Sequence, residues 1–245
     1  MNKISLTYPI ENSHHVACRD CALHPVCDPT PVGNIALDIS ETLVSKKTPV
    51  KAGEVIYQEG QPFEDLYAFT TGSAKEVWHY NQPEQQVISF KIIGELAGQN
   101  AIANGIYPYT LVALEDSSIC TIRYQDLLNS AKSLPHLLTK VIQLLSVDSH
   151  HESEIRKSFA IATNAEAKVR SFLYNISSRY KNRGRNHIDI KLSMSRSEIA
   201  SYLGITKETL SRSLTLLQNK GLVESSGKFI HISNFDLLSR HEESI

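Results

Sequence analysis

The stretch Ser195–Val223, which reads SRSEIASYLGITKETLSRSLTLLQNKGLV, decides the fold of the C-terminal part of the chain. Its apolar residues recur at helical spacing on both sides of one glycine: Ile199, Ala200 and Leu203 before Gly204, and Ile205, Leu210 and Leu214 after it. The glycine supplies a turn and the small Ala200 lets two helices cross closely, so the stretch predicts a helix-turn-helix. Residues 221–232, GLVESSGKFIHI, alternate around Gly227 and predict a two-stranded hairpin, the wing of a winged helix-turn-helix.

The outward side of the second predicted helix is polar and matches the donors and acceptors on DNA bases. Arg212 can donate two hydrogen bonds to guanine, Glu208 can accept one from the cytosine amino group, and Ser211 can approach either kind of partner. Three more residues are expected to contact phosphate: Arg196, Thr206 and Lys207. The alternative is a helical hairpin with solvated polar residues, which the helix, turn, helix, hairpin order and the local positive charge disfavour.

Charge is divided unevenly along the chain, although the formal net charge is only −1. Residues 160–245 carry 13 basic and 8 acidic side chains, a net +5, whereas residues 1–159 carry 12 basic and 18 acidic side chains, a net −6. A basic C-terminal domain is what a polyanionic partner such as double-stranded DNA requires, although an ordinary solvated basic face gives the same count.

Length and composition indicate a soluble globular protein of two domains, since the chain has 245 residues and 41% of them are hydrophobic. The N-terminus has no apolar run, and no stretch of about eighteen apolar residues occurs, so we expect a cytoplasmic location and no membrane partner. We find no Gly-rich phosphate loop, no HExxH motif and no nucleophile elbow. An enzyme is therefore not expected.

The middle of the chain changes from a strand pattern to a helix pattern. Between residues 46 and 124, short segments rich in β-branched and aromatic residues are separated by turns at Gly53, Gly60, Gly72, Pro83 and Gly94. This pattern predicts an antiparallel barrel or jelly roll. After Pro135 a long amphipathic helix is predicted, with one stripe formed by Leu137, Val141, Leu144, Asp148, His151 and Ile155. Glu152, beside this stripe, is also expected at a dimer contact. The stripe fits a symmetric dimer contact and fits equally well a helix packed on its own barrel.

Three of the four cysteines lie in CRDCALHPVC, at Cys18, Cys21 and Cys27, and the fourth is Cys120. In a reducing cytoplasm such thiols favour metal binding or redox chemistry over a structural disulfide. Zinc fits four thiolates, and His14, His15 and His24 are possible substitute ligands. Three local cysteines with one distant partner is a pattern that iron–sulfur clusters often use. The residues alone leave zinc and a cluster as near equals.

With barrel, long helix and winged helix-turn-helix in this order, the chain resembles the catabolite activator and FNR superfamily of bacterial transcription regulators. Residues 51–75 look like the β-roll signature of the superfamily, and residues 93–98, IGELAG, look like the start of its effector segment. The cyclic-AMP-binding branch has a Pro-Arg-Ser/Thr-Ala stretch whose arginine grips the cyclic phosphate. Here Pro108 is followed by Tyr109, so that bidentate partner is missing and cyclic-nucleotide control is not expected.

The FNR branch, named for its regulator of fumarate and nitrate reduction, carries Cys-x2-Cys-x5-Cys and a fourth cysteine late in the β-roll. The four cysteines of this chain match that pattern, and residues 208–212, ETLSR, match the branch's Glu-x-x-Ser-Arg. The resemblance implies a 4Fe-4S cluster as cofactor, held by Cys18, Cys21, Cys27 and Cys120. It also implies TTGAT-type half-sites read by Glu208, Ser211 and Arg212. Val26 and Ser213 depart from the family pattern. Val26 replaces a leucine thought to shield the cluster, which leaves the rate of reaction with oxygen open, and Ser213 replaces an apolar residue of the recognition helix, which bears on helix packing.

The resemblance thus implies an activator of anaerobic gene expression that senses oxygen, forms a homodimer and works with RNA polymerase. The expected fold is α+β in four parts: an N-terminal cluster-binding segment (1–33), a jelly-roll-like β-roll sensor domain (34–134), a dimerisation helix (135–162) and a winged helix-turn-helix DNA-binding domain (163–245). Residues 1–33 are too polar and proline-interrupted to hold a core, so metal ligation is expected to order them. The alternative is a regulator of the same fold with structural zinc or a small-molecule effector.

Overall fold

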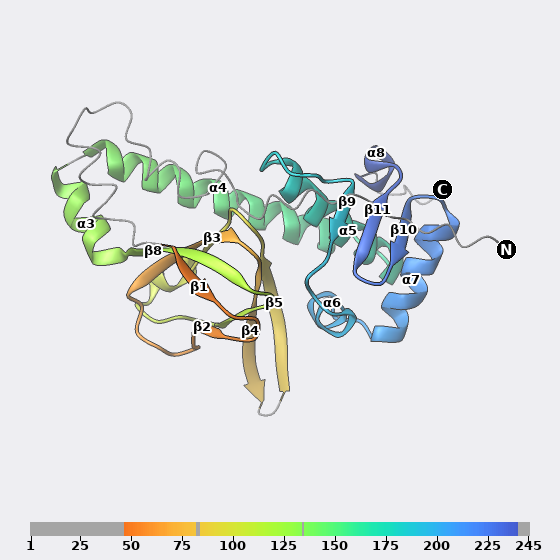
Figure 1. Ribbon diagram of the computed structural model, residues 1–245, viewed down its shortest axis with the longest axis horizontal. Helices are drawn as coiled ribbons and strands as arrows, with labels where there is room; N and C mark the ends of the chain where they lie inside the picture. Colours follow the sequence, from red (N-terminus) through yellow and green to blue (C-terminus); the bar gives the residue numbers. More distant parts are fainter. Residues whose placement is uncertain (1–46, 82–83, 134, 240–245) are drawn as a thin grey trace.

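The computed structural model describes residues 47–81, 84–133 and 135–239. Its elements follow the order strands, helices, then a smaller mixed domain, and Figure 1 shows one long helix lying along the β-roll and leading to the C-terminal domain. The cysteines of the N-terminal motif, Cys18, Cys21 and Cys27, lie outside the described residues, as does the segment 1–33. The predicted α+β architecture is confirmed.

The β-roll consists of two antiparallel sheets. One has the order β1-β8-β3-β6 and the other β2-β7-β4-β5. The bounds are β1 Thr48–Val50, β2 Val55–Tyr57, β3 Asp65–Thr71, β4 Ala74–Asn81, β5 Glu84–Lys91, β6 Leu96–Ala97, β7 Thr110–Ala113 and β8 Ser117–Arg123, with a 3-10 helix η2 at Gln99–Ala103. The strands β2 to β8 fall where the sequence predicts them, because period-2 patterns interrupted by glycine turns leave little choice of register, whereas β1 was not predicted.

One turn of the roll shows why it needs glycine. Gly72, between β3 and β4, has a positive φ of 78°, and a Cβ atom there would lie 2.1 Å from Oγ of Ser117. The core beneath contains fully buried Phe69 and Leu111 and a stacked pair, Tyr57 and Tyr107, with ring centroids 4.0 Å apart. Burial of these large side chains is the main stabilising term of the roll.

The helices α3 (Tyr124–Ser133) and α4 (Pro135–Ala160) close one side of the roll. Leu137 and Val141 of α4 are 5% and 8% exposed and pack in one cluster with Leu66, Ile122 and Leu127. For Leu137 and Val141, the packing matches the second of the two possibilities left open by the sequence, a helix packed on its own barrel. The apolar residues that α4 leaves exposed lie on other faces: Leu138, Ile142 and Val147.

Of the other residues in the predicted set, Leu144 and Asp148 also face the roll, and Ile155 is partly buried. Leu144 packs against the same cluster, and Asp148 Oδ2 accepts a hydrogen bond of 2.6 Å from Gln99. Glu152 is half-buried and lies 3.7 Å from Arg156. These contacts are all within one chain, so a dimer contact by the stripe stays a prediction.

The C-terminal domain has the bounds α5 Ala165–Lys181, β9 Asp189–Lys191, α6 Arg196–Leu203, α7 Lys207–Asn219, β10 Val223–Ser226, β11 Phe229–Ile232 and α8 Phe235–Ser239. Its sheet has the order β10-β11-β9. The hairpin β10–β11 is the predicted wing, whereas β9 was not predicted, since three residues carry too little pattern. Within the described ranges, no helix is both long and apolar enough to cross a bilayer.

Candidate nucleic-acid interface

Local capping fixes the ends of the two helices of the predicted helix-turn-helix. Ser195 caps α6 by accepting from the Glu198 backbone N–H at 3.2 Å, and Oε2 of Glu198 accepts from the Ser195 N–H at 2.6 Å. Gly204 ends α6 in the left-handed region, with φ 62° and ψ 41°. Thr206 then caps α7 by accepting from the Thr209 N–H at 3.2 Å. Each cap satisfies backbone groups that a short helix leaves unpaired, so the turn is specified locally.

The three residues predicted to read bases lie together on the solvent-exposed side of α7, while Leu210, Leu214 and Leu217 are buried on the other side. Ser211 donates to the Lys207 carbonyl at 3.0 Å, and Arg212 Nη2 donates to the Thr209 hydroxyl at 3.2 Å. The backbone N–H of Glu208 itself and the Thr206 hydroxyl lower the pKa of Glu208, so it is a carboxylate acceptor at neutral pH. Face and side-chain chemistry match a base-reading helix.

The residues predicted to contact phosphate occupy two different environments. Thr206 and Lys207 are exposed at the N-terminus of α7, where the helix dipole favours an anion. Arg196 instead contacts the wing: its Nη2 donates to Ser225 Oγ and to the Gly227 carbonyl, both at 2.9 Å. Burial lowers the pKa of Arg196. A phosphate contact by Arg196 stays a prediction, and the wing contact is a role that the sequence did not indicate.

Cys120 lies on β8, opposite Ala68 of β3, and is partly buried. Its side chain packs against the cluster that contains Leu137 and Val141 of α4. Among the residues that the structure describes, no three His, Cys, Asp or Glu side chains come together in a way that could hold a metal ion. Since the other three predicted ligands are outside these residues, the ligand set stays a prediction.

Two family models match the two halves of this architecture. The Cyclic nucleotide-binding domain matches residues 47–133, and the Crp-like helix-turn-helix domain matches residues 167–241. A β-roll followed by a helix and a winged helix-turn-helix, with an exposed polar face on α7, defines the class of protein: a DNA-binding transcription regulator and not an enzyme.

The chain is similar over most of its length to named regulators. It is 31% identical over 225 residues to the Fumarate and nitrate reduction regulatory protein of Escherichia coli K12, covering 92% of this chain and 90% of the relative. The Fumarate nitrate reduction regulatory protein of Klebsiella oxytoca matches with the same identity and coverage. The chain therefore belongs to the family of fumarate and nitrate reduction regulatory proteins, FNR.

Solved structures agree on the fold. FixK2 from Bradyrhizobium japonicum superimposes with a TM-score of 0.70 at 24% identity, covering 79% of this chain and 94% of FixK2. The c-di-GMP responsive regulator CLP from Xanthomonas campestris gives a TM-score of 0.61 at 18% identity, covering 83% of this chain and 100% of CLP. At such identities the likeness concerns the fold alone.

Proposed function

We propose that this regulator controls anaerobic gene expression by sensing oxygen through a 4Fe-4S cluster held by Cys18, Cys21, Cys27 and Cys120. The cluster controls dimerisation, and the dimer binds TTGAT-type inverted repeats and acts with RNA polymerase. The observation that carries the proposal is the packing of Cys120 against the group of buried apolar side chains that also includes Leu137 and Val141 of α4.

Cys120 suits a ligand role because it is a partly buried thiol on a well-paired strand. Cys120 is partly exposed, while the β8 backbone around it is held by both β1 and β3. A bound 4Fe-4S cluster would supply an oxygen-labile link between the N-terminal cysteines and this strand. A change of packing around Cys120 would then shift the position of α4, since side chains of both contribute to one group of buried apolar residues.

The exposed side of α4 supports a dimer contact that is displaced from the predicted stripe by about one residue. Leu138, Ile142, Leu145 and Ser149 follow one another at spacings of four, three and four, which is the repeat of a two-helix seam. Leu145 lies at the inner edge of this seam, since it is partly buried and also packs against the apolar cluster of the roll. Ile142 and Leu145 also line a shallow groove with Ser149 and Ser153. Further along, Glu152 and Arg156 make the seam polar, and burial raises the pKa of Glu152. Because half of this seam is polar, the dimer is expected to be weak, so that binding or loss of the cluster can shift the balance between monomer and dimer.

Dimerisation is required because one recognition helix makes few base contacts. Two copies of α7 must meet successive major grooves about 34 Å apart to read an inverted repeat. Glu208, Ser211 and Arg212 read the bases, and Lys207 with the N-terminus of α7 holds the phosphates.

The test is anaerobic purification of the full chain followed by an optical spectrum and sedimentation. We expect a brown protein that bleaches in air, and a dimer that becomes monomeric as it bleaches. Cys120→Ser should be colourless, whereas the control Ser118→Ala, on the same strand, should keep the colour. A colourless wild-type protein with stoichiometric zinc would overturn the proposal in favour of the zinc alternative.

A further inference from the structure

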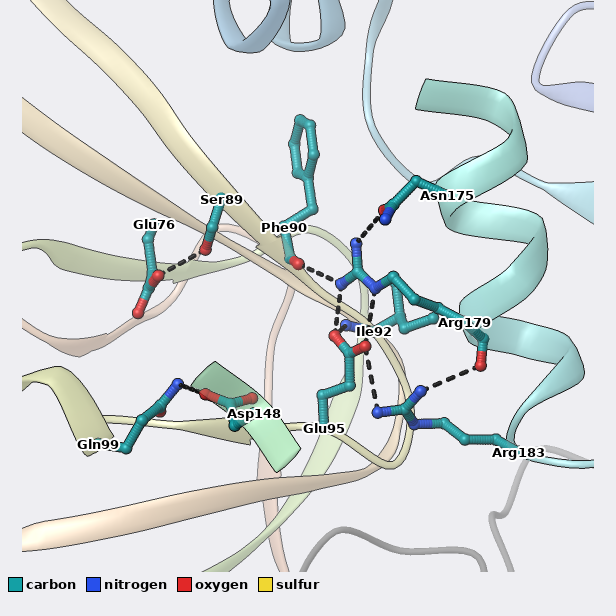
Figure 2. Close-up of polar contacts among 10 residues, drawn as sticks. All are labelled: Glu76, Ser89, Phe90, Ile92, Glu95, Gln99, Asp148, Asn175, Arg179 and Arg183. Carbon is teal, nitrogen blue, oxygen red and sulfur yellow. Dashed lines mark hydrogen bonds and ion pairs between the residues drawn. The ribbon is translucent and has the colours of Figure 1, made fainter. Parts of the chain in front are cut away.

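The β-roll and the DNA-binding domain meet at a buried ion pair. Glu95 lies in the turn after β5, and Arg179 lies in the last turn of α5. Figure 2 shows the Arg179 guanidinium facing the Glu95 carboxylate across the junction, with Nε donating to Oε1 at 2.8 Å and Nη2 donating to Oε2 at 2.5 Å. Arg183 approaches Oε1 to 3.2 Å from the following turn. The two groups therefore make a bidentate contact, which fixes direction as well as distance.

The remaining polar groups of this pair are also occupied. Oε2 of Glu95 accepts from the Ile92 N–H at 2.9 Å, which holds the carboxylate within its own turn. Arg179 also donates to the Phe90 carbonyl and to Asn175 Oδ1, as Figure 2 shows. The side chains of Arg179 and Glu95 are only 6% and 8% exposed. A buried pair with its hydrogen bonds satisfied admits one geometry, since any shift leaves a charge unpaired away from water.

Other contacts of the junction are less buried or have less directional character. Lys75 Nζ of β4 lies 2.7 Å from Glu198 of α6, and the Val87 N–H donates to Ser201 Oγ at 3.1 Å. Phe90 packs on Tyr202 with ring centroids 5.1 Å apart. These contacts hold the two domains together, and the Glu95–Arg179 pair adds the directional restraint.

Orientation set at α5 is carried directly to the recognition helix. Phe172 and Ile176 of α5 lie in one buried cluster with Leu210 and Leu217 of α7, and Phe90 of the roll belongs to that same cluster. A packed core transmits a rotation because it cannot deform continuously. The angle at which α7 projects from the roll is therefore fixed by the junction.

We propose that Glu95 and Arg179 are positioning residues that set the half-site spacing accepted by this regulator. The inference rests on the proposed dimer, because spacing has meaning only when two recognition helices bind one duplex. With the pair intact, the two α7 helices stand at one separation and one relative angle. Without it, each domain samples several orientations, so the dimer tolerates wrong spacings and binds the right one less tightly.

The experiment compares the full-length wild-type dimer with two variants, on duplexes that carry the same two half-sites and a spacer of optimal length or one base pair longer or shorter. Glu95→Gln removes the charge and keeps the shape, and Arg179→Lys keeps the charge and removes the bidentate contact. We expect each variant to lose about tenfold in affinity for the optimal duplex, because the competent orientation becomes a minor population. The preference for the optimal spacer should fall by a similar factor.

Two controls separate positioning from other roles. Glu166→Gln breaks an ion pair within the DNA-binding domain, where Lys220 Nζ lies 2.6 Å from Glu166, and it should leave the spacer preference unchanged. Arg212→Ala should lower affinity at every spacing and keep the preference. Circular dichroism and sedimentation establish that each variant is a folded dimer, and Arg179→Lys provides the test if Glu95→Gln does not fold.

The outcomes distinguish the two proposals. If Glu95→Gln and Arg179→Lys are folded dimers and both keep the spacer preference of the wild type, the positioning role is overturned and the proposed function remains intact. A wild-type protein that binds single half-sites as tightly as inverted repeats overturns the dimeric mode of binding, and the positioning role with it.

Discussion

Arg179 and Arg212 carry the same guanidinium group in opposite environments. Arg179 is buried at the junction of the two domains, where Glu95, Phe90 and Asn175 take up its donors. Arg212 is exposed on α7, and its Nη2 donates a 3.2 Å hydrogen bond to the Thr209 hydroxyl, one turn away. An arginine keeps its charge in both places, so what differs is which partner the fold leaves for it.

The difference shows how one chain divides its cations between assembly and recognition. A buried arginine keeps the partner it has in the fold, because moving its charge away from that partner without water to solvate it costs free energy. An exposed arginine pays little to change partners, so it remains available to a base or a phosphate. Lys75 lies between the two extremes, since its side chain is 17% exposed beside Glu198.

Removing the buried cation should have the largest effect. Arg179→Met leaves the Glu95 carboxylate buried without its bidentate partner, although Arg183 still lies 3.2 Å away, and we expect a loss of about 3 kcal/mol in the free energy of unfolding. Urea unfolding followed by circular dichroism measures it. The matched control is Lys51→Met, which breaks an exposed pair with Asp116 and should leave the unfolding curve unchanged. If Arg179→Met and Lys51→Met gave the same unfolding curve, the buried cation would contribute no more to stability than the exposed one, which contradicts this prediction.

Acid should weaken the same junction. Burial alone would raise the pKa of Glu95, but the charges of Arg179 and Arg183 and the hydrogen bonds from Arg179 outweigh it and lower the pKa from 4.5 to about 2. A folded-state pKa below the unfolded one gives stability that is complete above the unfolded value and is lost as pH falls toward the folded value. We expect about 3 kcal/mol to be lost between about pH 5 and pH 2.

Unfolding free energies of the wild type and Arg179→Met at pH 7, 5 and 3 provide the measurement for this acid effect. The difference between the two proteins should shrink as the pH falls, because the unfolded chain and the variant, which lacks Arg179, take up a proton at Glu95 at higher pH than the folded wild type does. A difference that stays constant across this range would show that Glu95 does not titrate in the way described.

Local pattern was enough to predict most of the fold. The strands from β2 to β8 and both helices of the helix-turn-helix lie where glycine turns, alternation and caps specify them within a few residues. The exposed polar face of α7, which is predicted to read bases, followed from the same information, since helical periodicity separates Leu210 and Leu214 from Glu208, Ser211 and Arg212.

Contacts between distant residues could not be predicted in this way. Glu95 and Arg179 are 84 residues apart, and nothing near either one in the sequence indicates a partner. Periodicity also placed a stripe on α4 without saying what covers it: Leu137 and Val141 face the roll, and the exposed Leu138 and Ile142 are their immediate neighbours. A helix presents several faces to different surroundings, and a single stripe identifies only one of them.

Removing the exposed cation should act on DNA binding and leave folding unchanged. Arg212→Ala should lower affinity for the inverted repeat by about 1–3 kcal/mol and relax discrimination at one guanine, because a bidentate base contact is lost. Competition assays with single-base variants of the half-site measure both effects. Lys207→Ala is the comparison: it should weaken all sequences alike and reduce the salt slope by about 1. Unaltered discrimination in Arg212→Ala would assign the base contact to another residue.

Arg196 shares features of both arginines, since it is half-buried and yet belongs to α6 of the helix-turn-helix. Because its Nη2 binds Ser225 and Gly227, Arg196→Ala should loosen the wing and lower the stability of the domain by about 1–2 kcal/mol, as expected for hydrogen bonds from a charged donor. The salt dependence of DNA binding decides whether it also holds phosphate. If the wing keeps Arg196 in the complex, its removal should flatten the salt slope clearly less than Lys207→Ala does. Equal flattening by the two variants would mean that Arg196 leaves the wing for the phosphate that the sequence predicts.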